Sequence, residues 1–150
     1  MVRFLCCFLA AMMLFSSCGN SYFREPTADA LLRDVMCDLG IADGYLYVRD
    51  ALAEHPLTDA MLERMFLGAS LEDLRYVKSM AAYLSGRLCE KEIIVIELFD
   101  MSHRKALTSL LTKRADLKDG ALVYAQGNYV YLLCTERNDE ILAFLREKIK

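Results

Sequence analysis

The sequence contains few prolines, glycines and histidines and no tryptophan. Its 150 residues include no tryptophan, two prolines, two histidines and seven glycines. Such low proline and glycine content excludes collagen-like and proline-rich low-complexity chains. Hydrophobic residues make up 55% of the chain and charged residues 26%, which excludes global disorder. The length fits one domain.

The chain also has no surplus of positive charge. It carries 18 basic and 21 acidic residues, for a formal net charge of −3. Proteins that bind DNA or RNA usually present a basic patch to the phosphate backbone. We therefore expect no nucleic-acid partner.

Recognisable catalytic and metal-binding motifs are missing too. The two histidines, His55 and His103, fall on different predicted elements, and no HExxH, zinc-type spacing, phosphate-binding loop or GxSxG occurs. Glu92 and Glu97 fall on opposite faces of one predicted strand, so they do not form a carboxylate pair. We predict no metal site, no cofactor and no catalytic residue, and we lean against an enzyme. A small exported hydrolase-like enzyme with an unrecognised site is the alternative, because a triad converges only in space.

What the sequence does have is an unusual beginning. Arg3 is the only charged residue before Arg24, and Phe4 to Phe15 is a run of twelve apolar residues. As a helix this run is about 18 Å long, against about 30 Å for the hydrocarbon core of a bilayer. A positive residue, a short apolar run and then small residues form the pattern of a signal peptide.

The segment Leu14-Phe15-Ser16-Ser17-Cys18 resembles the lipobox of bacterial lipoproteins. The resemblance implies cleavage before Cys18 and a diacylglycerol thioether on its thiol. We expect a leader at 1–17, a lipidated tether at 18–25 and one domain at 26–150, anchored to the cell membrane on its extracytoplasmic side. The alternatives are an uncleaved anchor, a buried N-terminal helix or an ordinary secretory cleavage.

Three cysteines lie beyond the proposed lipidation site. They are Cys37, Cys89 and Cys134, so one internal disulfide is the most that they can form. Three interpretations remain: three small buried side chains, one disulfide with one free thiol, or a reactive cysteine site.

Hydrophobic spacing predicts four helices and a central strand. Pro26-Thr27 opens the first helix, which ends at Gly40, and the strand covers Glu92–Asp100. Both faces of this strand are mostly apolar, so we expect helices on both sides of it. Three further helices are expected to begin at the caps Thr58 (with a stop at Gly68), Ser102 and Asn138.

Two stretches are ambiguous. Ile41 to Pro56 contains a possible short strand with Leu46 and Val48 on one face. Ser70 to Gly86 fits the spacing of a helix, and a strand at Tyr76–Tyr83 is the alternative.

The clearest local signal is a β-hairpin. Ala121–Gln126 and Tyr129–Thr135 are separated by Gly127-Asn128, which suits a two-residue turn. In the register that this turn imposes, one face of the hairpin carries small and apolar side chains: Ala121, Val123, Ala125, Val130, Leu132 and Cys134. The other face holds Leu122, Tyr124, Gln126, Tyr129, Tyr131 and Leu133. We expect Tyr124, Tyr129 and Tyr131 to form an aromatic platform for a partner, and the alternative is that a helix covers them.

The order of these segments resembles a family. EIIVIELFD, a helix, then AQGNYVYLL and a last helix is similar to domain of unknown function 4358, an uncharacterised family of small bacterial lipoproteins. The matching positions are Glu92 to Ile96 and Gly127 to Tyr129. The resemblance implies a strand at Tyr76–Ala82, the location of a lipoprotein and the fold of the family. It implies no activity, because none is established for the family.

Together these features predict an α+β fold with an antiparallel sheet of about four strands and helices packed on it. The expected function is a lipid-anchored, non-enzymatic binding module of the cell envelope, whose partner is the membrane and an envelope protein or polymer. A solute receptor usually needs two lobes, and this chain supplies one.

Overall fold

The computed structural model describes residues 25–66, 71–85 and 90–149. The predicted lipidation site Cys18, the cysteine Cys89 and the expected helix stop at Gly68 lie outside the described residues.

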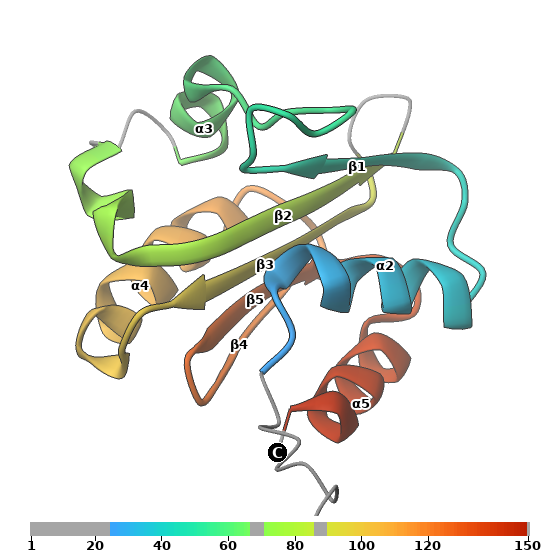
Figure 1. The fold of residues 1–150 in the computed structure, drawn as a ribbon. Helices are drawn as coiled ribbons and strands as arrows, with labels where there is room; N and C mark the ends of the chain where they lie inside the picture. Colours follow the sequence, from blue (N-terminus) through green and yellow to red (C-terminus); the bar gives the residue numbers. More distant parts are fainter. Residues whose placement is uncertain (1–24, 67–70, 86–89, 150) are drawn as a thin grey trace, which may run out of the picture.

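The described chain forms one five-stranded sheet with helices on both faces (Figure 1). The elements, in chain order, are α2 (Ala28–Asp38), β1 (Gly44–Val48), α3 (Asp59–Met65), the 3₁₀ turn η1 (Leu71–Tyr76), β2 (Val77–Ser85), β3 (Glu92–Leu98), the 3₁₀ turn η2 (Met101–His103), α4 (Arg104–Ala115), β4 (Leu122–Gln126), β5 (Tyr129–Cys134) and α5 (Asn138–Lys148). All neighbouring strands are antiparallel, in the order β1-β2-β3-β5-β4. The α+β prediction is confirmed, with five strands where we expected about four.

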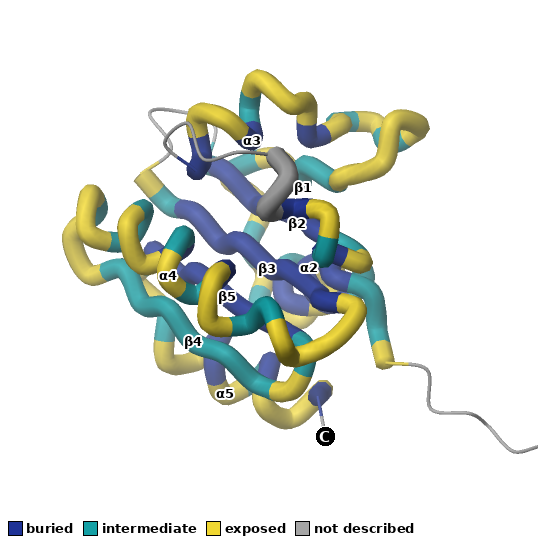
Figure 2. Tube along the Cα trace, turned by 90° about the vertical axis from the view of Figure 1, so that its left-hand side faces the viewer, coloured by how far each residue is buried: buried dark blue, intermediate teal, exposed yellow. Residues whose placement is uncertain are grey.

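Two apolar layers flank the sheet. On one face α2 and α5 bury Leu31, Val35, Ile141 and Leu145 against the strands. On the other face α3 and α4 cover the sheet. Every residue of the middle strand β3 is buried, as the apolar character of both its faces predicts (Figure 2).

The hairpin has the predicted register. Tyr124 lies opposite Tyr131 and Gln126 lies opposite Tyr129. Gly127 has a φ of 54°, a left-handed conformation that the two-residue turn requires and that glycine adopts without strain.

The ambiguous stretch before β3 is a strand. From Met80 to Leu84 every residue of β2 is buried, because β1 and β3 flank it and helices cover both its faces. A run of buried residues carries no period of two, so its apolar spacing also fits a helix. The ambiguous segment before it also contains a strand, the edge strand β1.

Two of the expected helix caps are wrong by a small shift. The Thr58 hydroxyl accepts from the backbone N–H of Met61 as expected. Ser102 instead lies inside η2, and the Asp100 carboxylate accepts from its backbone N–H at 2.7 Å. Asn138 is the first helical residue of α5 and accepts from the N–H of Thr135. In both cases a turn precedes the helix and moves the helix start relative to the polar residue.

Candidate functional site

The predicted tyrosine platform is not an open surface. Tyr129 and Tyr131 are 0% exposed, because this face of β5 packs in the layer that contains α2 and α5. Tyr124, on the edge strand β4, is half-buried, and the Arg146 guanidinium lies 4.5 Å from the centre of its ring. The alternative interpretation, in which helices cover the tyrosines, is the one that fits.

These tyrosines hold the fold together. The rings of Tyr129 and Tyr131 are nearly parallel, with centres 6.2 Å apart. The Tyr129 hydroxyl donates to the carbonyl of Pro26 at 2.6 Å, which fixes the chain just before α2. Burial raises the pKa of both phenols above the ordinary value, so both stay neutral.

The two histidines lie apart. His55 contacts the rings of Tyr45 and Tyr47 beside β1, whereas His103 stacks on Tyr76 next to α4. Among the residues that the structure describes, no three histidine, cysteine, aspartate or glutamate side chains are grouped to hold a metal ion.

The cysteines within the described ranges are both free. Cys37 is exposed and Cys134 is buried, in agreement with its predicted place on the small apolar face of the hairpin. These two cysteines therefore do not pair with each other.

Two buried glutamates stand at opposite ends of β3. Glu92 is 0% exposed, with one oxygen 2.7 Å from Arg114 Nε and the other 2.9 Å from Lys118 Nζ. Glu97 is also fully buried, and it accepts from Lys78 and from the Ser79 hydroxyl. Each has partners of its own, so the prediction that they do not act as a carboxylate pair agrees with the structure.

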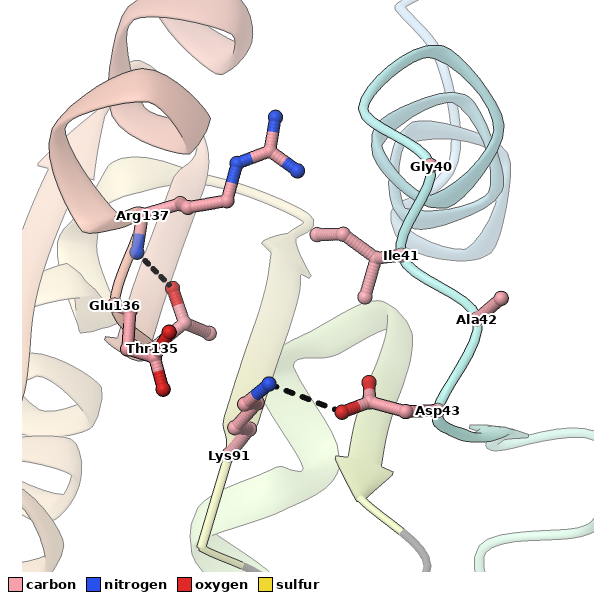
Figure 3. Close-up of a pocket in the computed structure, with 8 residues that line it drawn as sticks. All are labelled: Gly40, Ile41, Ala42, Asp43, Lys91, Thr135, Glu136 and Arg137. Carbon is pink, nitrogen blue, oxygen red and sulfur yellow. Dashed lines mark hydrogen bonds and ion pairs between the residues drawn. The ribbon is translucent and has the colours of Figure 1, made fainter.

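A cleft of about 480 Å³ opens at the end of the sheet where β3 begins (Figure 3). Its lining comes from three separate segments: Gly40 to Asp43 between α2 and β1, Lys91 before β3, and Thr135 to Arg137 between β5 and α5. Antiparallel pairing of β1 with β2, β2 with β3 and β3 with β5 brings these connections to one end of the sheet. The cleft is therefore a product of the sheet order.

Asp43 and Lys91 form one wall of the cleft, and the buried Tyr83 supports this wall from the core. Lys91 Nζ lies 3.0 Å from one carboxylate oxygen of Asp43, and the Tyr83 hydroxyl donates to the other oxygen. Gly44 sets this geometry, because a Cβ there would overlap the carbonyl of Leu84. Without a side chain, β1 approaches β2 closely and carries Asp43 to Tyr83.

These contacts fix the charges of the wall. The hydrogen bond from Tyr83, followed by that from Lys91, lowers the pKa of Asp43. The hydrogen bond to Asp43 raises the pKa of Lys91. Burial, with a smaller effect of the bond to Asp43, raises the pKa of Tyr83. Near neutral pH the three groups are thus an anion, a cation and a neutral phenol.

The opposite wall of the cleft is formed by Arg137. Its guanidinium donates to both oxygens of Glu140, at 2.6 and 2.7 Å, and to the carbonyl of Leu39 at 2.6 Å. The last bond joins the start of α5 to the end of α2. The carboxylate of Glu140 raises the pKa of Arg137, so this wall carries a fixed positive charge that is matched by Glu140.

This arrangement suits recognition more than proton transfer. Proton transfer needs a group with a pKa near the working pH, and the shifts at Asp43, Lys91 and Tyr83 all move away from neutrality. Both signs of charge lie around the partly buried Ile41. A ligand with charges of both signs and a small apolar group matches such a surface.

The sequence analysis missed Asp43, Lys91 and Arg137. They belong to no motif and are far apart in the chain, so no local spacing marks them. The only related prediction concerned helix ends. Gly40, the predicted end of one helix, and Asn138, the predicted start of another, border two of the connections that line the cleft.

No described helix is long and apolar enough to cross a membrane. No family model matches the chain, and comparisons with curated proteins and with solved structures find no match either. The resemblance to the lipoprotein family therefore stays a prediction.

Proposed function

We propose that this chain is a lipid-anchored lipoprotein on the extracytoplasmic side of the cell membrane, and that its domain binds a partner without catalysing a reaction. The observation that carries the proposal is Leu14–Cys18, which follows Arg3 and the apolar run. Nine residues separate Cys18 from α2, the first helix of the described chain. The resemblance to domain of unknown function 4358 supports the same location.

The anchor requires no spanning helix. Each buried methylene of an acyl chain contributes about 0.8 kcal/mol, so two chains on Cys18 hold a protein of this size firmly. Seven residues separate Cys18 from Pro26, and fully extended they reach about 25 Å. The tether thus keeps the start of the domain close to the bilayer.

The cleft is the binding surface that we propose. It combines Asp43, Lys91 and Arg137 with the partly buried Ile41, and it lies away from the point where the tether joins. We propose as partner an envelope protein or polymer that carries both signs of charge. The alternative is a small exported enzyme, which would need a group whose pKa lies near the working pH. The pKa values of Asp43 and Lys91 are instead shifted away from neutrality.

Metabolic labelling with palmitate tests the anchor. The wild-type chain should incorporate label and Cys18→Ala should not, because the thiol is the attachment point. Cys37→Ala is the matched control, since this cysteine is exposed and free, and it should label like the wild type. Equal labelling of Cys18→Ala and the wild type would end the proposal.

Photo-cross-linking in intact cells tests the cleft. A benzophenone side chain in place of Ala42, an exposed residue of the lining, should give a defined adduct. The same probe in place of Leu52, which is 94% exposed outside the cleft, should not. Lys91→Glu should abolish the adduct at position 42 because it reverses the charge of one wall. An adduct that survives this change would contradict recognition at the cleft.

A further inference from the structure

Two large apolar side chains are exposed at the end of the sheet opposite the cleft. Phe99 is 65% exposed and Met101 is 57% exposed, just after β3 and in η2. The seven residues of β3 span about 20 Å from Glu92 at the cleft end to Leu98 at this end. Exposed aromatic and methionine side chains that lie together often mark an interaction site.

The tether joins the domain at this same end. The Tyr129 hydroxyl holds the carbonyl of Pro26, and Ser79 Oγ accepts from the N–H of Ala28 at 2.8 Å. Tyr129 lies opposite Glu97, two residues before Phe99. Figure 1 shows the β4–β5 turn, the arrowhead of β3 and the blue start of the described chain at one end of the sheet.

Positive charge surrounds the two apolar side chains. Arg104 donates to the carbonyl of Gly127 in the hairpin turn at 3.3 Å and contacts the sulfur of Met101. Lys105 is exposed at the start of α4. Arg75 lies over the ring of Tyr76, whose carbonyl accepts from the N–H of Phe99. Asp100, between Phe99 and Met101 in the chain, caps Ser102 and keeps its negative charge because the hydrogen bonds from Ser102 lower its pKa, so it offsets one of the three positive charges.

We propose that these residues form a membrane-facing patch, consisting of Phe99, Met101, Arg75, Arg104 and Lys105, that contacts anionic lipid headgroups and orients the domain with its cleft away from the bilayer. The inference rests on the proposed function, because the lipid on Cys18 brings this end to the membrane. The seven-residue tether keeps the end that carries Pro26 within about 25 Å of the bilayer, so the patch beside it can reach the headgroups.

A bilayer matches the patch in chemistry. Aromatic side chains favour the membrane interface, and basic side chains are attracted to anionic headgroups. Two apolar side chains and three charges are weak as an independent anchor. Once the acyl chains have localised the domain, the effective concentration of lipid is high and weak contacts suffice to set its orientation.

The chain has no tryptophan, so a single introduced one reports its own surroundings. The test uses the complete lipoprotein, reconstituted in vesicles of phosphatidylglycerol and phosphatidylethanolamine, with Phe99→Trp as the probe. The control is Leu117→Trp, 67% exposed just beyond the far end of α4. Brominated lipids should quench Phe99→Trp several-fold more than Leu117→Trp, and the emission of Phe99→Trp should shift to the blue.

The outcomes separate this inference from the proposed function. If the protein floats with the vesicles but the two tryptophans are quenched equally little, the anchor holds and the patch proposal is overturned. If Phe99→Trp is shielded in native membranes but not in lipid vesicles, the patch binds a protein, which also overturns it. A chain that does not float with vesicles overturns both proposals.

A charge reversal tests the electrostatic part. Lys105→Glu in the Phe99→Trp chain should reduce quenching on anionic vesicles and change little on phosphatidylcholine vesicles. Lys113→Glu, an exposed lysine at the other end of α4, is the matched control and should leave the quenching as it is. Equal effects of the two reversals would contradict contact at this end. The effect of Lys105→Glu should fade as salt is raised, because the Debye length falls below about 10 Å above 0.1 M.

Discussion

The two ends of the sheet differ in how they use their charges. At the cleft end, Asp43, Lys91 and Arg137 all have partners and surround a hollow. At the other end, which the proposed tether would join and which we call the tether end, Phe99 and Met101 are exposed beside Arg104. The first arrangement suits a ligand of defined shape and charge. The second suits a broad, fluid surface such as a bilayer.

The difference follows from the layers of the fold. Helices cover both faces of the sheet, so the strands have little surface left for recognition (Figure 2). Connections at the strand ends are free of this constraint. Tyr129 and Tyr131 illustrate this, because they lie on a strand face that helices cover and are therefore part of the core.

The strongest test of this rule is Tyr131→Ala, which removes a fully buried ring from the middle of β5. It should lower the free energy of unfolding by about 4 kcal/mol, within the range for buried aromatic truncations. Urea unfolding of a fragment beginning at Gly19 measures this. Tyr45→Ala, at a site 53% exposed, should cost less than about 1 kcal/mol. Equal costs would mean that the face is open after all.

The buried acid at the cleft end should be the more sensitive of the two glutamates. Glu92→Gln leaves Arg114 and Lys118 without their anion, and the side chains of these two residues are only 14% and 17% exposed. Removing one partner of a buried ion pair costs about 3 kcal/mol or more. The midpoint of urea unfolding should fall accordingly. A change below about 1 kcal/mol would show that the two cations reach water easily.

Glu97→Gln, at the tether end, should cost less. Its partner Lys78 is 38% exposed and can turn into water, so we expect a loss of about 1–2 kcal/mol. The same unfolding experiment, run beside Glu92→Gln, measures the difference. A larger loss for Glu97→Gln would reverse the comparison of the two ends.

The smallest expected effect is a pH dependence at the cleft. The pKa of Asp43 is lower in the folded chain than its ordinary value of 3.8. Its contribution to stability is therefore present above pH 3.8 and is lost as the pH falls through the folded value. Thermal unfolding should show Asp43→Asn less stable than the wild type at pH 6, with the gap closing toward pH 2. A gap of constant size would mean that the carboxylate charge is not what Tyr83 and Lys91 stabilise.

Local signals were predicted well. The hairpin register follows from Gly127 and Asn128, because a two-residue turn leaves one pairing. The end of α2 followed from Gly40, whose φ of 63° is left-handed. The predictions that Ser102 and Asn138 cap their helices were wrong, since a 3₁₀ turn or a bend before a helix displaces its start without a clear mark in the sequence.

The sequence by itself determined the fold class, the hairpin and the buried middle strand β3. These depend on neighbours within a few residues, where backbone geometry and hydrophobic spacing decide. Only the tertiary structure decided that Tyr129 and Tyr131 are covered, and that Asp43, Lys91 and Arg137 meet in one cleft. Both depend on which strands pair and which helix packs on which face, and those contacts join segments that are far apart in the chain.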